Sequence, residues 1–429
     1  MTHEPLNARN PWAWIPTLYF AQGIPYVVVM TVSVIMYKRM GISNTDIALY
    51  TSWLYLPWVI KPLWSPVVEM FRTKRLWIIT LQLVVGGSLA SVALVLPMPH
   101  FFQYTLAIFW LMAFSSATHD IAADGFYMLG LEQHQQAAFV GVRSTFYRVA
   151  MITGQGLLVV LAGSIETRTG GNIPFAWSVT FGVLAGLFLL FFIYHKFILP
   201  YPATDKPTLS DGSHSALDEF FRTFVVFFKK RNIGATLGFL LLYRFAEAQL
   251  VKLVSPFLLD PRDKGGLGLT TSEVGIVYGT VGIIALTLGG LLGGYVVSRK
   301  GLRFWLWIMV CAIHLPDTMF IYLSQVQPHN FLLINLAVAV EQFGYGFGFT
   351  AYMLYMIMVS EGEHKTAHYA ICTGFMALGM MLPGMFSGWL QEQIGYQHFF
   401  LWVILSTIPG FVVAAFVKVD PEFGKKKES

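Results

Sequence analysis

Two aspartates, Asp120 and Asp124, lie four residues apart inside a long apolar stretch of the chain. If this stretch is a helix, both carboxyl groups project from one face, about 6 Å apart along the axis. Two carboxylates so close in a medium of low polarity cannot both stay charged cheaply, so one is suited to carry a proton. His119, directly before the pair, adds an imidazole that can titrate. The spacing predicts a proton-binding site, with a purely structural acid–arginine pair as the alternative.

Further ionisable residues occur in the apolar stretches that follow. Arg143 and Arg148 could neutralise the aspartates, or could bind an anionic ligand, because a guanidinium group grips a carboxylate or phosphate through a fork of hydrogen bonds. Arg244 and Glu247 are three residues apart, which permits a pair within one helix. Lys252 has no acid at helical spacing. A charge in the bilayer interior costs from about 2.5 kcal/mol upward, so each of these residues is a candidate functional residue.

The candidates form two groups at this point. The candidates for proton coupling are Asp120, Asp124, Glu247, Glu341 and His119. The candidates for substrate binding are Gln22, Tyr26, Lys61, Arg143, Tyr147, Arg148, Arg244 and Lys252. Asp317, next to Pro316, belongs either to a polar pathway or to a helix kink. We predict no catalytic residue, metal site or cofactor, because the sequence has neither an HExxH motif nor a Cys/His cluster.

The elements that must position these residues follow from composition. Of the 429 residues, 55% are hydrophobic and 12% are charged, and the mean hydropathy is +0.60. Ordinary soluble domains carry roughly 25% charge, so a soluble enzyme is excluded. An outer-membrane barrel is also excluded, because its strands are alternating segments of about ten residues rather than long apolar stretches. The chain is long enough for about twelve membrane-spanning helices with short connections.

We therefore predict an all-α membrane protein with two halves of six helices each. The first six helices are expected at about 12–37, 46–69, 76–97, 101–130, 139–163 and 174–199, and the second six at about 233–258, 272–297, 303–325, 329–360, 366–390 and 397–418. The domains are then 1–199, a cytoplasmic linker over 200–231, and 232–429. Within the linker, a short amphipathic helix on the membrane surface is expected to present Leu217, Phe220, Phe221, Phe224 and Phe228. No cleavable signal peptide is expected.

The basic residues indicate the orientation of the chain. Of the 28 lysines and arginines, 18 fall on the side of both termini, five on the opposite side and five inside the expected helices. The positive-inside rule therefore places both termini in the cytoplasm. The net charge of +5 marks a cytoplasmic membrane face and not a nucleic-acid surface.

The two halves contain related sequences. Residues 41–48 read GISNTDIA and residues 268–275 read GLTTSEVG, and the acid of each, Asp46 or Glu273, is expected to cap a helix start. Two parallel halves of this kind are typical of the major facilitator fold, in which the substrate path runs between the halves. Residues 294–303, GYVVSRKGLR, resemble the facilitator loop pattern GxxxDRxGRR.

That resemblance implies a cytoplasmic gate made by acids and bases at helix ends. The gate candidates are Glu69, Arg72, Arg75, Arg299 and Arg303. Ser298 stands where the pattern has its acid and Leu302 stands where it has a base. Plain anchoring of the basic residues at the cytoplasmic face is the alternative interpretation.

Four strings narrow the resemblance to one family. YFAQGIPY (19–26), LPWVIKPLWSPVVE (56–69), SSATHDIAADGF (115–126) and FYRVAMITGQG (146–156) resemble the AmpG-like muropeptide permeases and the related acetyl-CoA transporters of the facilitator superfamily. The residues that fall on family positions are Gln22, Gly23, Pro25, Lys61, Trp64, Pro66, Asp120, Asp124, Tyr147 and Arg148. His119 replaces a family glutamine and Glu69 replaces a family aspartate.

The resemblance implies a secondary active transporter rather than an enzyme. It would import GlcNAc–anhydroMurNAc-type solutes across the bacterial inner membrane, by proton symport and alternating access. The alternatives are uniport or export of acetyl-CoA-like or other amphiphilic anions or drugs, and a receptor that binds a ligand without moving it. The expected partners are a small amphiphilic solute, protons and the lipid bilayer, with no nucleic acid, and the expected state is a monomer.

Overall fold

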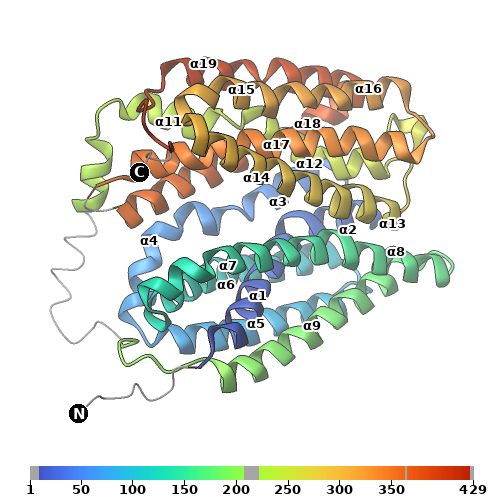
Figure 1. Ribbon diagram of the computed structural model, residues 1–429. Coiled ribbons are helices and arrows are strands. Elements are labelled where there is room, and N and C mark those ends of the chain that lie inside the picture. Colours follow the sequence, from blue (N-terminus) through green and yellow to red (C-terminus); the bar gives the residue numbers. More distant parts are fainter. Residues whose placement is uncertain (1–8, 207–221, 363–364, 426–429) are drawn as a thin grey trace, which may run out of the picture. The chain divides into compact units, whose positions relative to one another are not determined.

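The computed structural model describes residues 9–206, 222–362 and 365–425, and within these ranges all regular structure is helical (Figure 1). The first six passages consist of α1 (Ile15–Val27), η2 (Val28–Val32) and α2 (Ser33–Arg39); α3 (Asn44–Trp53) and α4 (Leu56–Met70); α5 (Lys74–Val95); α6 (Phe101–Gly130); α7 (Gln133–Ile152), η3 (Thr153–Leu158) and α8 (Val159–Arg168); and α9 (Ile173–Ile198). A short turn of helix, η1 (Pro11–Ala13), precedes them.

The second six passages follow the same plan. They consist of α11 (Ile233–Leu242) and α12 (Phe245–Leu259); α13 (Thr271–Val274), η6 (Gly275–Gly282) and α14 (Ile283–Lys300); α15 (Leu302–His314), η7 (Leu315–Asp317) and α16 (Thr318–Val326); α17 (Phe331–Ser360); and α18 (Lys365–Leu405) with α19 (Ile408–Phe416). A short turn, η5 (Arg262–Lys264), lies between α12 and α13.

The predicted number of membrane passages is confirmed. Among the described residues, nine helical stretches are long and apolar enough to cross a membrane. One of them, 365–416, counts twice, because Gly395 leaves the helix at φ 73° and ψ 167°. The second and seventh passages complete the twelve, since each is divided into two pieces of 10 and 15 residues. In the second passage, Pro57 at the start of α4 disfavours helical backbone in the residue before it.

Of the two acids predicted to cap a helix start, Glu273 is confirmed, whereas at the start of α3 the cap is Ser43 and Asp46 lies in the first turn. The Ser43 hydroxyl accepts a hydrogen bond from the Asp46 amide and donates one to the Asp46 carboxylate. Thr270 and Glu273 form a reciprocal capping box at the start of α13. These pairs satisfy backbone amides that the first turn of a helix leaves without partners.

The chain folds into two compact units that interleave along the sequence. The first unit contains 1–29, 63–154 and 164–220, and the second contains 30–62, 155–163 and 221–429. Two of the crossings, after Val29 and after Gly154, fall inside the π-helices η2 and η3. The division of domains at 199 and 232 stays a prediction. Of the predicted surface helix, residues 222–228 are helical, and Leu217, Phe220 and Phe221 lie outside the described residues.

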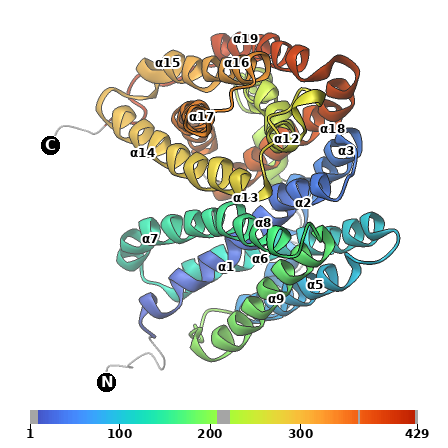
Figure 2. The same cartoon turned by 90° about the vertical axis from the view of Figure 1, so that its right-hand side faces the viewer.

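In the second unit, small residues allow α14 and α17 to pack closely (Figure 2). A Cβ atom added to Gly289 would lie 2.1 Å from the Phe343 carbonyl oxygen, and one added to Gly346 would lie 2.0 Å from the Leu286 carbonyl oxygen. Such small-residue contacts are a common basis for helix association in membranes, where apolar burial gives little driving force. The aromatic rings of Phe239, Tyr243 and Tyr352 pack beside this pair of helices.

Gly346→Val should destabilise the purified protein, because the added side chain would collide with backbone atoms of α14. Overpacking typically costs about 1–3 kcal/mol, so we expect a clear fall in the unfolding temperature in detergent. Gly294→Val is the matched control, since a Cβ atom at Gly294 meets nothing within 4 Å. Equal unfolding temperatures for the two variants would contradict the close packing.

Candidate functional site

An ion pair joins α6 to α7 in the first unit. Arg143 Nη2 lies 2.8 Å from Asp124 Oδ1, and the guanidinium group stands over the rings of Tyr19, at 4.7 Å, and Tyr127, at 5.5 Å. The Tyr19 hydroxyl donates to Asp124 over 3.4 Å. The pairing of an aspartate with an arginine, predicted as an alternative from the sequence, is therefore formed by Asp124. About a third of each partner's side chain stays exposed.

Other predicted residues of the first unit lie close to this pair. The Tyr147 ring is within electrostatic range of Asp120, Asp124 and Tyr26. Gly23 permits close contact of α1 with α7. A Cβ atom added to Gly23 would lie only 2.7 Å from the Cβ atom of Ala150. Spacing alone did not identify Tyr19 and Tyr127 as the aromatic platform for Arg143.

Two predicted substrate-binding residues present polar atoms with no protein partner. Among the described residues, neither Gln22 Oε1 nor Arg148 Nη1 has a hydrogen-bond partner, and Arg148 forms no ion pair with either aspartate. Both atoms are buried within the protein. Arg148 therefore keeps a donor available for an anionic or carbonyl group of a ligand.

His119 belongs to a chain of buried polar side chains that links α6, α5, α9 and α1. Its Nε2 lies 3.3 Å from Gln82 Nε2, Gln82 Oε1 lies 2.9 Å from His195 Nδ1, and His195 Nε2 lies 2.9 Å from Thr17 Oγ1. An amide nitrogen can only donate, so His119 Nε2 accepts this hydrogen bond and the imidazole is neutral in this arrangement. The proposed role of His119 in proton coupling stays a prediction.

Lys252 is a buried cation in the second unit. Its side chain is 2% exposed, its Nζ donates to Thr51 Oγ1 over 2.9 Å, and it stands 5.2 Å from the ring centre of Tyr55. No acid lies within ion-pair distance of Lys252 among the described residues. A buried ammonium group held by one hydroxyl and one ring is suited to bind an anion. Lys61 also belongs to the second unit and is partly buried.

Arg244 does not pair with Glu247, although their spacing permits it. The helix is interrupted between α11 and α12, and Arg244 has φ −108° and ψ 22°, so the regular spacing is lost. Its guanidinium group donates to the Tyr345 hydroxyl and stands 4.7 Å from the ring centre of Phe349.

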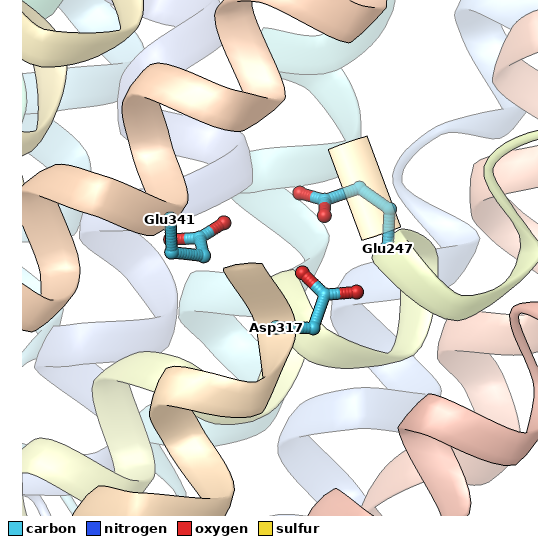
Figure 3. Close-up of side chains that lie close together, drawn as sticks. All are labelled: Glu247, Asp317 and Glu341. Atoms are coloured by element: carbon cyan, nitrogen blue, oxygen red, sulfur yellow. The ribbon is translucent and has the colours of Figure 1, made fainter. Parts of the chain in front are cut away.

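Three carboxyl groups meet instead. Glu247 of α12, Asp317 of η7 and Glu341 of α17 each offer an oxygen within 4.8 Å of the others, and their side chains point toward one another (Figure 3). The three residues are 0%, 1% and 1% exposed, respectively. Glu247 and Glu341 were predicted for proton coupling, whereas Asp317 was left open between a polar pathway and a kink. Pro316 was the available signal in the sequence, because α15 ends at His314 and the short η7 that contains Pro316 places Asp317 at its end.

Two of the predicted cytoplasmic gate arginines bind groups other than an acid within their own units. Arg75 donates to the carbonyl oxygens of Lys196 and Leu199 and stacks on Tyr201, while Arg299 donates to the Tyr295 hydroxyl. Arg72 and Arg303 are exposed, and nothing is described for the side chain of Glu69. Among the described side chains, none of the four arginines forms an ion pair with an acid. The gate stays a prediction.

A polar network that the sequence did not predict lies within the second unit. Lys38 Nζ is 2.7 Å from Asp260 Oδ1, and the Tyr396 hydroxyl donates to Asp260 Oδ2 over 2.6 Å. Asn44 Nδ2 donates to Gln391 Oε1 over 2.6 Å and to the Tyr396 hydroxyl over 2.9 Å. The network ties the α2–α3 connection to the end of α12 and to α18. By the chain order, these connections lie at the membrane face opposite to the termini.

Comparison with known proteins identifies the superfamily. A model of the Major Facilitator Superfamily matches residues 17–357 and 251–429. The chain belongs to this superfamily. It is a multi-pass membrane transporter, and the resemblance predicted from its sequence strings is confirmed.

Individual relatives agree with this assignment. A Rickettsia conorii protein named "Putative transporter AmpG 4" is 26% identical over 415 residues, which cover 93% of this chain and 94% of that protein. The anhydromuropeptide permease of Escherichia coli K12 is 24% identical, with 96% of this chain and 80% of the permease covered. Among solved structures, a bacterial homologue of the human lysosomal transporter Spinster, in an inward-facing conformation, has a TM-score of 0.72 at 14% identity, covering 96% of this chain and 97% of that one.

A double-mutant cycle tests the Lys38–Asp260 pair. Lys38→Ala and Asp260→Ala should each lower the unfolding temperature in detergent, because each leaves a largely buried charge without its partner. The double variant should lose much less than the sum of the two, with a coupling of about 0.5–3 kcal/mol. Additive losses would show that the pair contributes nothing.

Proposed function

We propose that this protein imports anhydro-muropeptide-like solutes, of the GlcNAc–anhydroMurNAc type, across the bacterial cytoplasmic membrane by proton symport. The observation that carries the proposal is the similarity to the Escherichia coli anhydromuropeptide permease over 96% of the chain. The similarity to the Rickettsia AmpG 4 protein, over 93% of the chain, supports the same class of solute. Transport would follow alternating access, and both termini would be cytoplasmic, in agreement with the distribution of basic residues.

The buried cations support an anionic solute. Such a sugar–peptide carries carboxylate groups, which guanidinium and ammonium groups bind through charge-assisted hydrogen bonds. In the first unit we assign recognition to Gln22, Tyr26, Tyr147 and Arg148. In the second unit we assign it to Lys61, Arg244 and Lys252. Arg148 and Lys252 are the strongest candidates, because neither is neutralised by an acid among the described residues.

The Asp124–Arg143 pair offers a direct route from proton binding to solute binding. A proton on Asp124 removes the negative charge that holds Arg143, since the two atoms are 2.8 Å apart. The guanidinium group is then free to take a carboxylate of the solute. Asp120 and His119 are assigned to the same coupling step, and the protein acts as a monomer without chemical conversion of the solute.

Counterflow in proteoliposomes tests the function. The purified protein is reconstituted with unlabelled GlcNAc–anhydroMurNAc-peptide inside, and the entry of labelled solute is measured with and without an imposed pH gradient. We expect exchange without a gradient, and accumulation when the outside is more acidic. A parallel series with acetyl-CoA tests the alternative solute class. Exchange of acetyl-CoA but not of the muropeptide would contradict the proposal.

Asp124→Asn should abolish accumulation driven by a pH gradient while exchange counterflow continues, because the amide cannot bind or release the proton. Asp46→Asn is the matched control, since the Asp46 carboxylate accepts a hydrogen bond from Ser43 in the first turn of α3 and its loss is expected to leave coupling intact. Undiminished uphill uptake by the Asp124 variant would rule out this residue as a coupling group.

Lys252→Met should weaken solute binding, because it removes a buried positive charge and keeps the apolar length of the side chain. A hydrogen bond to a charged group contributes about 1.5–3 kcal/mol, so the half-saturating concentration should rise about tenfold or more. The concentration dependence of counterflow measures this change, with exposed Lys264→Met as control. An unchanged half-saturating concentration would remove Lys252 from the binding site.

A further inference from the structure

We propose that Glu247, Asp317 and Glu341, the carboxyl cluster, form a second proton-binding site that holds protons in the absence of solute. The role of the site in transport rests on the proposed function, but the binding of protons by the cluster does not. The site adds Asp317, a residue for which the sequence offered no firm role, and it lies entirely within the second unit.

The geometry of the cluster requires charge neutralisation. Its three side chains come from α12, η7 and α17, are almost completely buried, and bring their oxygens within 4.8 Å of one another. Three negative charges at that separation repel one another strongly in a medium of low polarity. Carboxyl groups that share a site therefore retain protons that isolated groups would release.

The hydrogen-bond partners of the cluster point to protons as the ligand. Among the described residues, the four carboxyl oxygens of Glu247 and Asp317 have no hydrogen-bond partner, and Glu341 accepts one hydrogen bond, from Gln342 Nε2 at 3.0 Å. A buried acceptor without a donor is costly. A proton on one carboxyl group converts it into a donor for its neighbour, so protonation supplies the donors that the surrounding side chains do not.

The neighbouring charged and titratable groups set the number of protons. Arg244 lies within electrostatic range of Glu247 and contributes one positive charge, although its guanidinium group is directed to the Tyr345 hydroxyl. Tyr278 of η6 lies within electrostatic range of Glu341 and Glu247, and also of Tyr345 and Tyr55. His314 turns its ring to Tyr243 and Phe411 instead. Three carboxylates and one guanidinium carry a net charge of −2, so neutrality needs two protons.

The positions of the three residues connect proton release to movement of helices. Asp317 ends a one-turn break between α15 and α16, and Arg244 lies at the break between α11 and α12. Loss of a proton would leave uncompensated negative charge among α12, η7 and α17, and repulsion would favour their separation. The segments beside the two breaks are the parts of these passages that can turn with least loss of backbone hydrogen bonds.

Infrared difference spectroscopy of the solute-free, full-length protein in lipid nanodiscs tests the site. As the pH is raised, we expect the loss of a carbonyl-stretch band of buried protonated carboxyl groups. The band should weaken in Asp317→Asn and in Glu341→Gln, which keep the shape of each side chain, and should be unchanged in the exposed control Asp420→Asn. Two cluster variants are used so that one misfolded protein cannot decide the result.

Three outcomes overturn the proposal. These are the absence of the band, its persistence at full strength in both cluster variants, and its removal at constant pH by Na⁺ or Ca²⁺, which would make the cluster a metal-ion site. Counterflow of the muropeptide is measured on the same preparations. Counterflow without the band refutes the carboxyl cluster alone, whereas the band without counterflow refutes the muropeptide function and leaves the proton site standing.

Discussion

The cost of charge inside an apolar helical bundle governs this structure. An ionisable side chain in such a bundle is either offset by a neighbour of opposite charge or left to be neutralised by a ligand, and the protein shows three arrangements. Asp124 forms an ion pair with an arginine, Lys252 contacts a hydroxyl group and an aromatic ring, and Glu247 lies beside two other acids. The first arrangement is neutral as it stands, whereas an anion would neutralise the second and protons would neutralise the third. A transporter needs such unneutralised charges, because their neutralisation by a ligand contributes binding energy.

Breaks in the helical backbone are the second feature on which the arrangement of the charged residues depends. A regular helix directs successive side chains in fixed steps of about 100°, so a break in the backbone changes the direction of the side chains beside it. The break at Arg244 lies three residues before Glu247, and η7 itself contains Asp317. Between α14 and α17, by contrast, Gly289 and Gly346 allow the two helix backbones to pack directly against each other. The bundle is therefore tight where helices must hold together and interrupted where charged groups must meet.

The sequence predicted the parts of this arrangement that depend on local pattern. The length of the apolar stretches predicted the twelve passages, and the neighbouring passage offered Arg143 and Arg148 as partners for Asp120 or Asp124. The spacing of Arg244 and Glu247 favours an ion pair only if the helix is continuous. The break between α11 and α12 could not be predicted, because no proline marks it. The contact of Lys38 with Asp260 could not be predicted, since the two residues are far apart in the sequence and only tertiary packing brings them together.

The π-helix η2 sets the rotational phase of everything that follows it in the first passage. A π-turn contains one residue more than an α-turn, so α2 is rotated by about 100° from the position that an uninterrupted helix would give it. Lys38 lies near the end of α2 and reaches Asp260 from that rotated position. A single-residue deletion within Val28–Val32 would lengthen the regular helix, yet it would turn the ammonium group away from its acid. The extra residue of η2 thus sets the rotation of α2, and through it the contact of Lys38 with Asp260 about two turns further along the helix.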